Sequence, residues 1–320
     1  MKMSPLPNSL LKSLGRGELL LGGALVLAAA LLILPVPAVV VDFLLALNIA
    51  TAMLLLLLAL QVSDALKVAA FPAMLLVTTL FRLALNVSTT RLILRDGDAG
   101  EVVQAFGNFV TAGNPLVRGV VFVILTVVQF LVIAKGSERV AEVAARFTLD
   151  AMPGKQMSID ADLRSSAIEQ SEARHRRLQL ERESQFYGAM DGAMKFVKGD
   201  AVAGIVITLV NILGGLAVGM LQRGLGATEA MGTYTLLTIG DGLVSQIPAL
   251  LISTAAGLVV TRVRPENPAS GGDLGRQIVG QLRSHPVVPG LAGAVLTLLG
   301  LVPGMPTVAF CLLGLGLVAL

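Results

Sequence analysis

Three ionisable side chains interrupt runs of apolar residues in this sequence: Arg82, Asp200 and Asp241. An ionisable group at membrane depth costs several kcal/mol unless it is paired or hydrated, and such groups often mark ion or substrate pathways. Each of the three is therefore a candidate functional residue. Asp200 and Asp241 are the candidates for proton coupling, because a carboxylate can bind and release a proton.

A stripe of polar residues surrounds Arg82. Thr79, Arg82, Asn86 and Thr90 recur at steps of three, four and four, which places them on one face of a helix. That face must point into a bundle, where it forms either a structural polar seam between helices or a functional site. Arg91 lies half a helical rotation from Arg82, and we expect it to reach the outer interface.

Asp200 follows Gly199 at the expected start of an apolar span. One interpretation is a helix N-cap, which accepts hydrogen bonds from backbone N–H groups. The other is a protonatable carboxylate at the mouth of a conduit, close to Lys195 and Lys198.

Asp241 lies between Gly240 and Gly242, and Pro248 follows seven residues later. This pattern predicts a broken helix whose freed backbone lines a wet cavity. If the helix starts near Tyr234, Asp241 lies about 10 Å inside the outer boundary. Capping of a half-helix and proton coupling are compatible roles for this carboxylate.

The elements that position these residues are transmembrane helices. Hydrophobic residues make up 55% of the 320 residues and charged residues only 14%, against about 25% in soluble domains. The sequence predicts an all-α, polytopic membrane protein with about eight spans. The expected spans are Leu19–Leu34, Val39–Leu60, Val68–Leu94, Arg118–Ala134, Ala201–Leu221, Tyr234–Val260, Val287–Leu301 and Met305–Leu320.

A charged segment, Lys135–Asp200, separates the fourth and fifth spans. It holds 11 of the 24 Lys/Arg and 11 of the 21 Asp/Glu residues. We therefore divide the chain into a four-helix membrane bundle (1–134), a charged cytoplasmic loop (135–200) and four further helices (201–320). Within the loop we expect a short helix over Gly136–Arg146, a break at Met152–Gly154 and a helical, solvated stretch over Asp160–Ser184. Phe186–Lys198 should lie along the inner interface.

Basic residues set the orientation, because Lys and Arg concentrate on the cytoplasmic side. With the N-terminus inside, 19 of them fall in inside segments and three, Arg95, Arg118 and Arg223, in outside segments. Eight spans then place the C-terminus inside as well.

Several functions are excluded or disfavoured. The sequence has no phosphate-binding loop of the Walker type and no nucleophile-elbow or zinc-protease motif, so we do not expect an enzyme. Cys311 is the single cysteine, and His175 and His285 are isolated, so we expect no metal and no cofactor. No basic patch with interleaved aromatic residues suggests nucleic-acid binding. Work by this protein must therefore use a gradient or partner proteins.

Four stretches of the sequence resemble the membrane part of one family, the export gates of flagella and of type III secretion injectisomes (the FlhA/SctV type). They are Phe71–Leu94, Ala145–Asp162, Phe186–Gly204 and Gly240–Ala249. Such long linked stretches are highly specific, and the resemblance covers nearly the whole chain.

The resemblance implies a subunit of the bacterial inner membrane that couples the proton motive force to export of unfolded proteins. It implies a homo-oligomeric ring of nine subunits, contacts with other export-apparatus subunits and the lipid bilayer, and indirect work with a cytoplasmic ATPase complex. It further implies essential charges in the loop and in the spans, with proton coupling at the position of Asp200. The implied residues are Arg139, Arg146, Asp150, Asp191, Lys195 and Asp200 in the loop, and Arg82, Arg91 and Asp241 in the spans. Lys198 is a further candidate in the charged loop.

Several alternatives stay open. Family members continue into a large cytoplasmic domain, so we expect this chain to be a fragment. The resemblance fits a flagellar or an injectisome system, and protons or sodium as the coupling ion. A proton-coupled small-molecule transporter and a passive membrane scaffold are the other functions considered. Our mechanistic hypothesis is that protons from the outer side pass from Asp241 to Asp200. Protonation weakens the attraction of Asp200 to Lys195, Lys198 or arginines of the charged loop, so that the loop moves.

Overall fold

A computed structural model describes residues 16–109, 115–262, 274–301 and 306–318, and all regular structure in these residues is helical. Residues 1–15, which include Lys2 and Lys12, lie outside them, as does most of the connection after Arg262. The chain divides into two compact units, one of Met1–Ala59 with Ala65–Arg262, the other of Leu60–Asp64 with Val263–Leu320.

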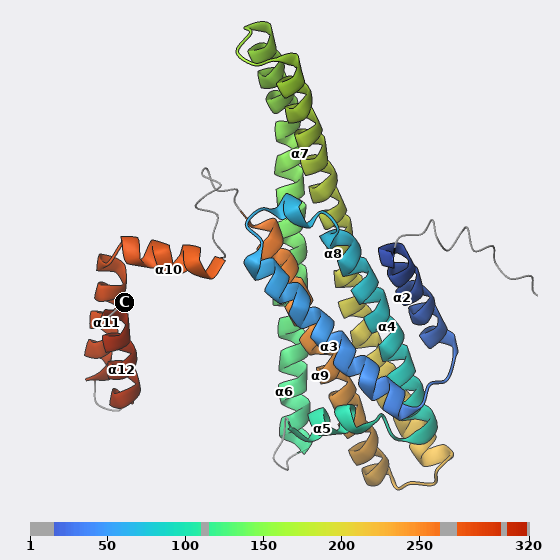
Figure 1. Cartoon of the computed structure of the whole chain (residues 1–320). Coiled ribbons are helices and arrows are strands. Elements are labelled where there is room, and N and C mark those ends of the chain that lie inside the picture. Colours follow the sequence, from blue (N-terminus) through green and yellow to red (C-terminus); the bar gives the residue numbers. More distant parts are fainter. Residues whose placement is uncertain (1–15, 110–114, 263–273, 302–305, 319–320) are drawn as a thin grey trace, which may run out of the picture. The chain divides into compact units, whose positions relative to one another are not determined.

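The first unit carries the long helices (Figure 1). In chain order they are α2 (Arg16–Ile33), α3 (Ala38–Gln61), the 3₁₀ helix η1 (Ala65–Val68), α4 (Phe71–Asp96), α5 (Glu101–Phe109), α6 (Pro115–Val127), the π-helix η2 (Val128–Ala134), α7 (Lys135–Arg164), α8 (Gln170–Leu221) and α9 (Ala227–Val260).

Five helices among the described residues are long and apolar enough to cross a membrane: Ala38–Gln61, Phe71–Asp96, Gly119–Arg164, Gln170–Leu221 and Ala227–Val260. The expected membrane protein and its all-helical fold are therefore confirmed. The expected count of eight spans is not confirmed, because three of the apolar helices are shorter. They are Leu21–Ile33, Val287–Gly300 and Thr307–Val318. Helices of 14 and 12 residues extend about 21 and 18 Å, less than the roughly 30 Å of a bilayer core.

The charged segment is a helical hairpin rather than a loop. The fourth span continues through η2 into α7, which runs unbroken past Pro153 to Arg164. The expected break at Met152–Gly154 is therefore wrong. α7 packs along α8, and this packing maintains helix where local propensity favours a break. The hairpin turns at Ser166, whose φ is +58°, and extends beyond α3, α4 and α9 (Figure 1).

α4 and α9 form the centre of this unit. α4 packs against α2, α8 and α9, and α9 packs against α5, α6, α7 and α8. One apolar cluster includes Phe71, Met190 and Ile252, and a second includes Leu45, Leu85 and Tyr234. Because the polar face of α4 is enclosed by this packing, its ionisable group must find a partner within the protein.

The connection after α4 contains the short helix α5. Gly97, at φ +65°, ends α4, and its N–H donates to the Ile93 carbonyl at 3.0 Å. The two carboxylate oxygens of Asp42 accept hydrogen bonds from the N–H groups of Glu101 and Val102, each at 3.0 Å. Asp42 thus ties the start of α5 to α3.

The second unit contains α10 (Leu274–Ser284), α11 (Val287–Gly300) and α12 (Thr307–Val318). α11 and α12 pack closely at Gly293 and Gly314, where a Cβ added to Gly293 would lie 3.1 Å from the backbone nitrogen of Val318. Small residues commonly allow such close approach between apolar helices.

Candidate functional site

A buried ion pair joins α4 to α8. The Arg82 guanidinium donates to the Asp200 carboxylate, although 118 positions separate the two residues. Arg82 is 1% exposed and Asp200 4% exposed. Both charges are therefore largely desolvated. The attraction between them offsets the free-energy cost of this desolvation.

Asp200 is not a helix N-cap, as one interpretation held. It lies well inside α8, which begins at Gln170 and continues to Leu221. The expected attraction to Lys195 or Lys198 is also wrong, because both lysines pair elsewhere. The ammonium of Lys195 lies 2.7 Å from Asp191, and that of Lys198 lies 2.8 Å from Glu138 on α7.

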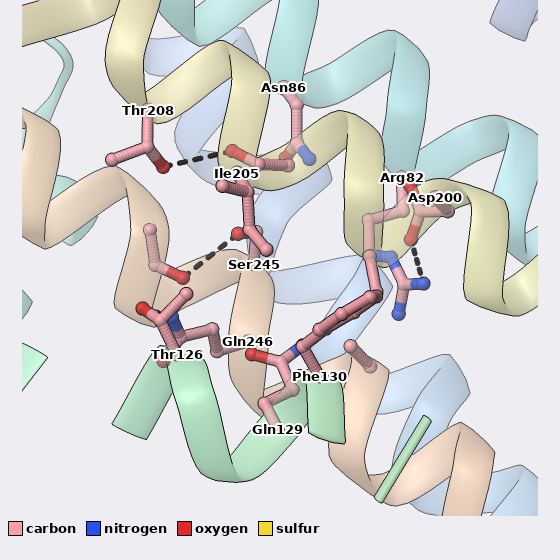
Figure 2. A pocket seen from close by; sticks show the side chains of 14 residues that line it. Arg82, Asn86, Thr126, Gln129, Phe130, Asp200, Ile205, Thr208, Ser245 and Gln246 are labelled. Carbon is pink, nitrogen blue, oxygen red and sulfur yellow. Dashed lines mark hydrogen bonds and ion pairs between the residues drawn. The ribbon is translucent and has the colours of Figure 1, made fainter. Parts of the chain in front are cut away.

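A small polar pocket opens beside the ion pair (Figure 2). Its volume is about 30 Å³. It is lined by residues of α4, α6, η2, α8 and α9: Arg82, Asn86, Thr126, Gln129, Phe130, Asp200, Ala201, Gly204, Ile205, Thr208, Gly242, Ser245, Gln246 and Ala249. Four segments that are remote in sequence therefore meet at the two charges.

Asp241 forms a second buried polar contact, between α9 and α8. It is 5% exposed, and the side-chain N–H of Asn211 donates to its carboxylate at 3.3 Å. Asp241 does not line the pocket beside Asp200, although the next residue, Gly242, does.

The predicted broken helix at Asp241 is wrong, because α9 runs continuously from Ala227 to Val260. The glycines serve close packing instead. A Cβ at Gly240 would overlap the Val103 carbonyl of α5, and one at Gly242 would lie 2.5 Å from the Phe122 ring of α6. Gly240 and Gly242 therefore let α5 and α6 approach α9 on either side of the carboxylate.

The polar stripe on α4 faces the interior, as expected, but its members differ. Thr79 and Asn86 are buried, and the Thr79 hydroxyl donates to the Leu75 carbonyl of its own helix at 2.6 Å. Thr90 is half-buried. Arg91 donates to the Leu32 carbonyl at 2.9 Å and so binds the carboxyl end of α2.

The remaining predicted charges lie on the hairpin. Arg139 pairs with Glu142 at 2.7 Å within α7, and Arg146 and Asp150 are exposed on the same helix. Among the α7–α8 ion pairs of the described residues, the Lys198–Glu138 pair lies nearest in sequence to Asp200. The functional roles of these charges and of the stripe stay predictions.

Sequence reasoning missed three polar partners. Asn211 binds Asp241, Glu138 binds Lys198, and the side-chain amide of Gln246 donates to the Thr126 hydroxyl at 2.8 Å. Asn211 had a detectable signal, since it is a lone amide in an apolar run. Glu138 resembles an ordinary charged residue near a span end, whereas Gln246 lies in the middle of the sixth span.

Comparisons with known proteins point to one family. The model of the FHIPEP family matches residues 28–320. The chain is 55% identical over 301 residues to low calcium response locus protein D of Yersinia pestis, covering 94% of this chain and 42% of that protein. It is 56% identical over 278 residues to flagellar biosynthesis protein FlhA of Bacillus subtilis, covering 87% and 40%.

Protein MxiA of Shigella flexneri is 53% identical over 303 residues, covering 95% of this chain and 44% of that protein. The chain thus spans less than half the length of these relatives. No solved structure matches it.

Proposed function

This chain belongs to the FHIPEP family, and on that premise we propose that it is an inner-membrane export-gate component of a type III protein secretion apparatus. Relatives named for flagellar biosynthesis and for harpin secretion support this assignment. The observation that carries the mechanism is the buried Arg82–Asp200 pair, which joins the membrane helix α4 to the helix that continues into the charged hairpin.

We propose that a proton reaching Asp200 breaks this pair. A neutral carboxyl no longer compensates Arg82, so α8 and the hairpin shift relative to α4. One proton crossing 100 mV supplies about 2.3 kcal/mol. This energy is of the same order as the free-energy cost of breaking one buried ion pair. Repeated binding and release of protons would convert the proton motive force into movement that admits or pulls an unfolded substrate.

The proposal includes assembly and placement. We infer a homo-oligomeric ring of nine subunits beside other export-apparatus subunits, with the cytoplasmic ATPase complex acting separately. The N-terminus, the α7–α8 hairpin and the end of the chain would lie on the cytoplasmic side. The charged residues of the hairpin, 135–200, would act as a separate functional region between the membrane segments.

The test replaces Asp200 by Asn, which keeps its size and removes its charge. We expect secretion to fall by about tenfold or more, since one proton-dependent step of about 1.4 kcal/mol corresponds to that factor. The readout is secreted protein per cell, normalised to the level of this subunit in the membrane. Glu181→Gln, which neutralises an exposed carboxylate on the same helix, should leave secretion unchanged.

Normal secretion by Asp200→Asn at normal subunit level would overturn proton coupling at this residue. A passive scaffold would then be the better interpretation. A proton-coupled small-molecule transporter would instead show substrate uptake in vesicles that contain this protein alone.

A further inference from the structure

We propose that the pocket beside Arg82 and Asp200 is a water-binding site, and that water held there carries the proton to and from Asp200. This inference rests on the proposed function, because it names the group that serves the carboxylate. Ser245 and Gln246 of α9 and Gln129 of η2 would position the water as hydrogen-bonding partners, without binding substrate themselves.

The first observation is unused hydrogen-bonding capacity on both charges. The Oδ2 atom of Asp200 accepts a hydrogen bond from Arg82. The other carboxylate oxygen, Oδ1, has no hydrogen-bond partner among the described residues. The same holds for Nη1 of Arg82. A charged group in a buried site strongly favours partners for all of its polar atoms. Both side chains line the pocket, and we place the missing hydrogen-bond partner there.

The second observation is the size of the pocket. Its volume is about 30 Å³, and a water molecule needs roughly 10–15 Å³ of such space and two to four polar partners. The pocket thus admits one or two water molecules, and it is too small for an organic ligand.

The third observation is the polar wall that α6, η2 and α9 contribute (Figure 2). Gln246 donates its side-chain amide to the Thr126 hydroxyl at 2.8 Å, so its side-chain carbonyl can still accept. The Ser245 hydroxyl donates to the Gly242 carbonyl at 2.9 Å, so its lone pairs can still accept. Water between the walls would donate to these oxygens and to Asp200 Oδ1, and accept from Arg82 Nη1.

The proton step needs nothing beyond water. A hydronium ion in the pocket transfers one proton to Oδ1 of Asp200, which becomes a neutral carboxylic acid, and a water molecule remains. Release is the reverse, from the carboxylic acid to pocket water. No other bond forms or breaks.

Gly204 supplies a way to add volume at the pocket wall without a clash. This residue lines the pocket on α8, and a Cβ added to it would meet no atom within 4 Å. An added methyl group therefore enters open space instead of striking a neighbour. Alanine also favours helix more than glycine does, so Gly204→Ala should fold at least as well as the natural protein.

The experiment compares Gly204→Ala and the larger Gly204→Val with Gly188→Ala in the full secretion apparatus. Gly188 is an exposed glycine on the same helix with equally open surroundings. We expect Gly204→Val to lower secretion by about tenfold at normal subunit level, which corresponds to losing one hydrogen bond to a charged group. Gly204→Ala should give a smaller loss, and Gly188→Ala none.

A second readout measures the proton directly. Infrared spectra in H₂O and D₂O report exchange at the Asp200 carboxyl, whose band is identified by its loss in Asp200→Asn. We expect Gly204→Val to slow this exchange at least severalfold relative to Gly188→Ala. Natural rates of both secretion and exchange in Gly204→Val would overturn the water site.

The outcomes separate the two proposals. Loss of secretion in Asp200→Asn with natural secretion and exchange in Gly204→Val rejects the water site and leaves the export gate intact. Natural secretion in Asp200→Asn rejects proton coupling at Asp200, and the water site as its proton carrier falls with it.

Discussion

At the scale of single residues, the proposed coupling depends on two charges that are almost wholly removed from bulk solvent. Arg82 and Asp200 are almost wholly buried and bind each other across α4 and α8. A buried ion pair contributes little net stability, yet removal of one partner leaves an uncompensated charge. This asymmetry makes the pair suitable as a switch, because adding one proton to the carboxylate has the effect of removing a partner.

The asymmetry predicts the behaviour of a double variant. Asp200→Asn alone should lower the free energy of unfolding by about 3–5 kcal/mol, because it leaves Arg82 buried without a counter-charge. Arg82→Gln with Asp200→Asn should recover most of that loss. The measurement is thermal unfolding of the purified protein in nanodiscs.

Secretion by the same double variant distinguishes a purely structural ion pair from one that couples proton binding to export. A purely structural ion pair predicts that secretion returns together with stability. We expect stability without secretion, since the double variant has no proton-binding group at this place. Recovery of secretion would contradict the switch.

At the scale of elements, glycines decide how closely the helices meet. Gly215 and Gly219 of α8 face Tyr234 of α9, and a Cβ at Gly215 would lie 2.6 Å from Cγ of the tyrosine ring. That separation is far below van der Waals contact, so a side chain at Gly215 would force the two helices apart. The contact lies in the same α8–α9 interface as Asn211 and Asp241.

A matched pair of glycine variants tests this packing. Gly215→Ala should lower the free energy of unfolding by about 1–3 kcal/mol through overpacking. Gly188→Ala, on the exposed surface of the same helix, should raise it by about 0.5–1 kcal/mol through helix propensity. Thermal unfolding in nanodiscs measures both, and equal effects of the same sign would argue against the close approach.

The continuity of α7 shows the limit of local patterns. Pro153 and Gly154 predict a break, yet the helix continues for ten residues past Gly154 to Arg164 because α8 supports it along its length. Likewise, the glycines around Asp241 predict a broken helix, whereas they accommodate α5 and α6. In both cases a contact with a distant segment determined the local backbone.

At the scale of the whole molecule, α8 is much longer than a membrane is thick. Its 52 residues extend about 78 Å, whereas the bilayer core is about 30 Å. Roughly 48 Å of the helix must therefore lie outside the hydrocarbon. The charged residues before Asp200 identify the end that projects into water.

Cysteine labelling tests the orientation of this helix. Cys311 is the single natural cysteine, so Cys311→Ala provides a clean background. Ser166→Cys at the hairpin turn should react with a membrane-impermeant maleimide only in inverted vesicles. Gln222→Cys, at the other end of α8, should react only from the outside of spheroplasts. The reverse pattern would invert the proposed topology.

The sequence by itself determined the membrane class, the all-helical fold and the family, because these follow from long apolar runs and from linked stretches of matching residues. It also identified Arg82, Asp200 and Asp241, since a buried ionisable group is costly wherever the chain folds. Only the tertiary structure decided that Asp200 binds Arg82 instead of a neighbouring lysine, and that Asn211 binds Asp241. The physical reason is that pairing in a bundle depends on which helix faces meet, and residues 118 positions apart carry no local trace of that meeting.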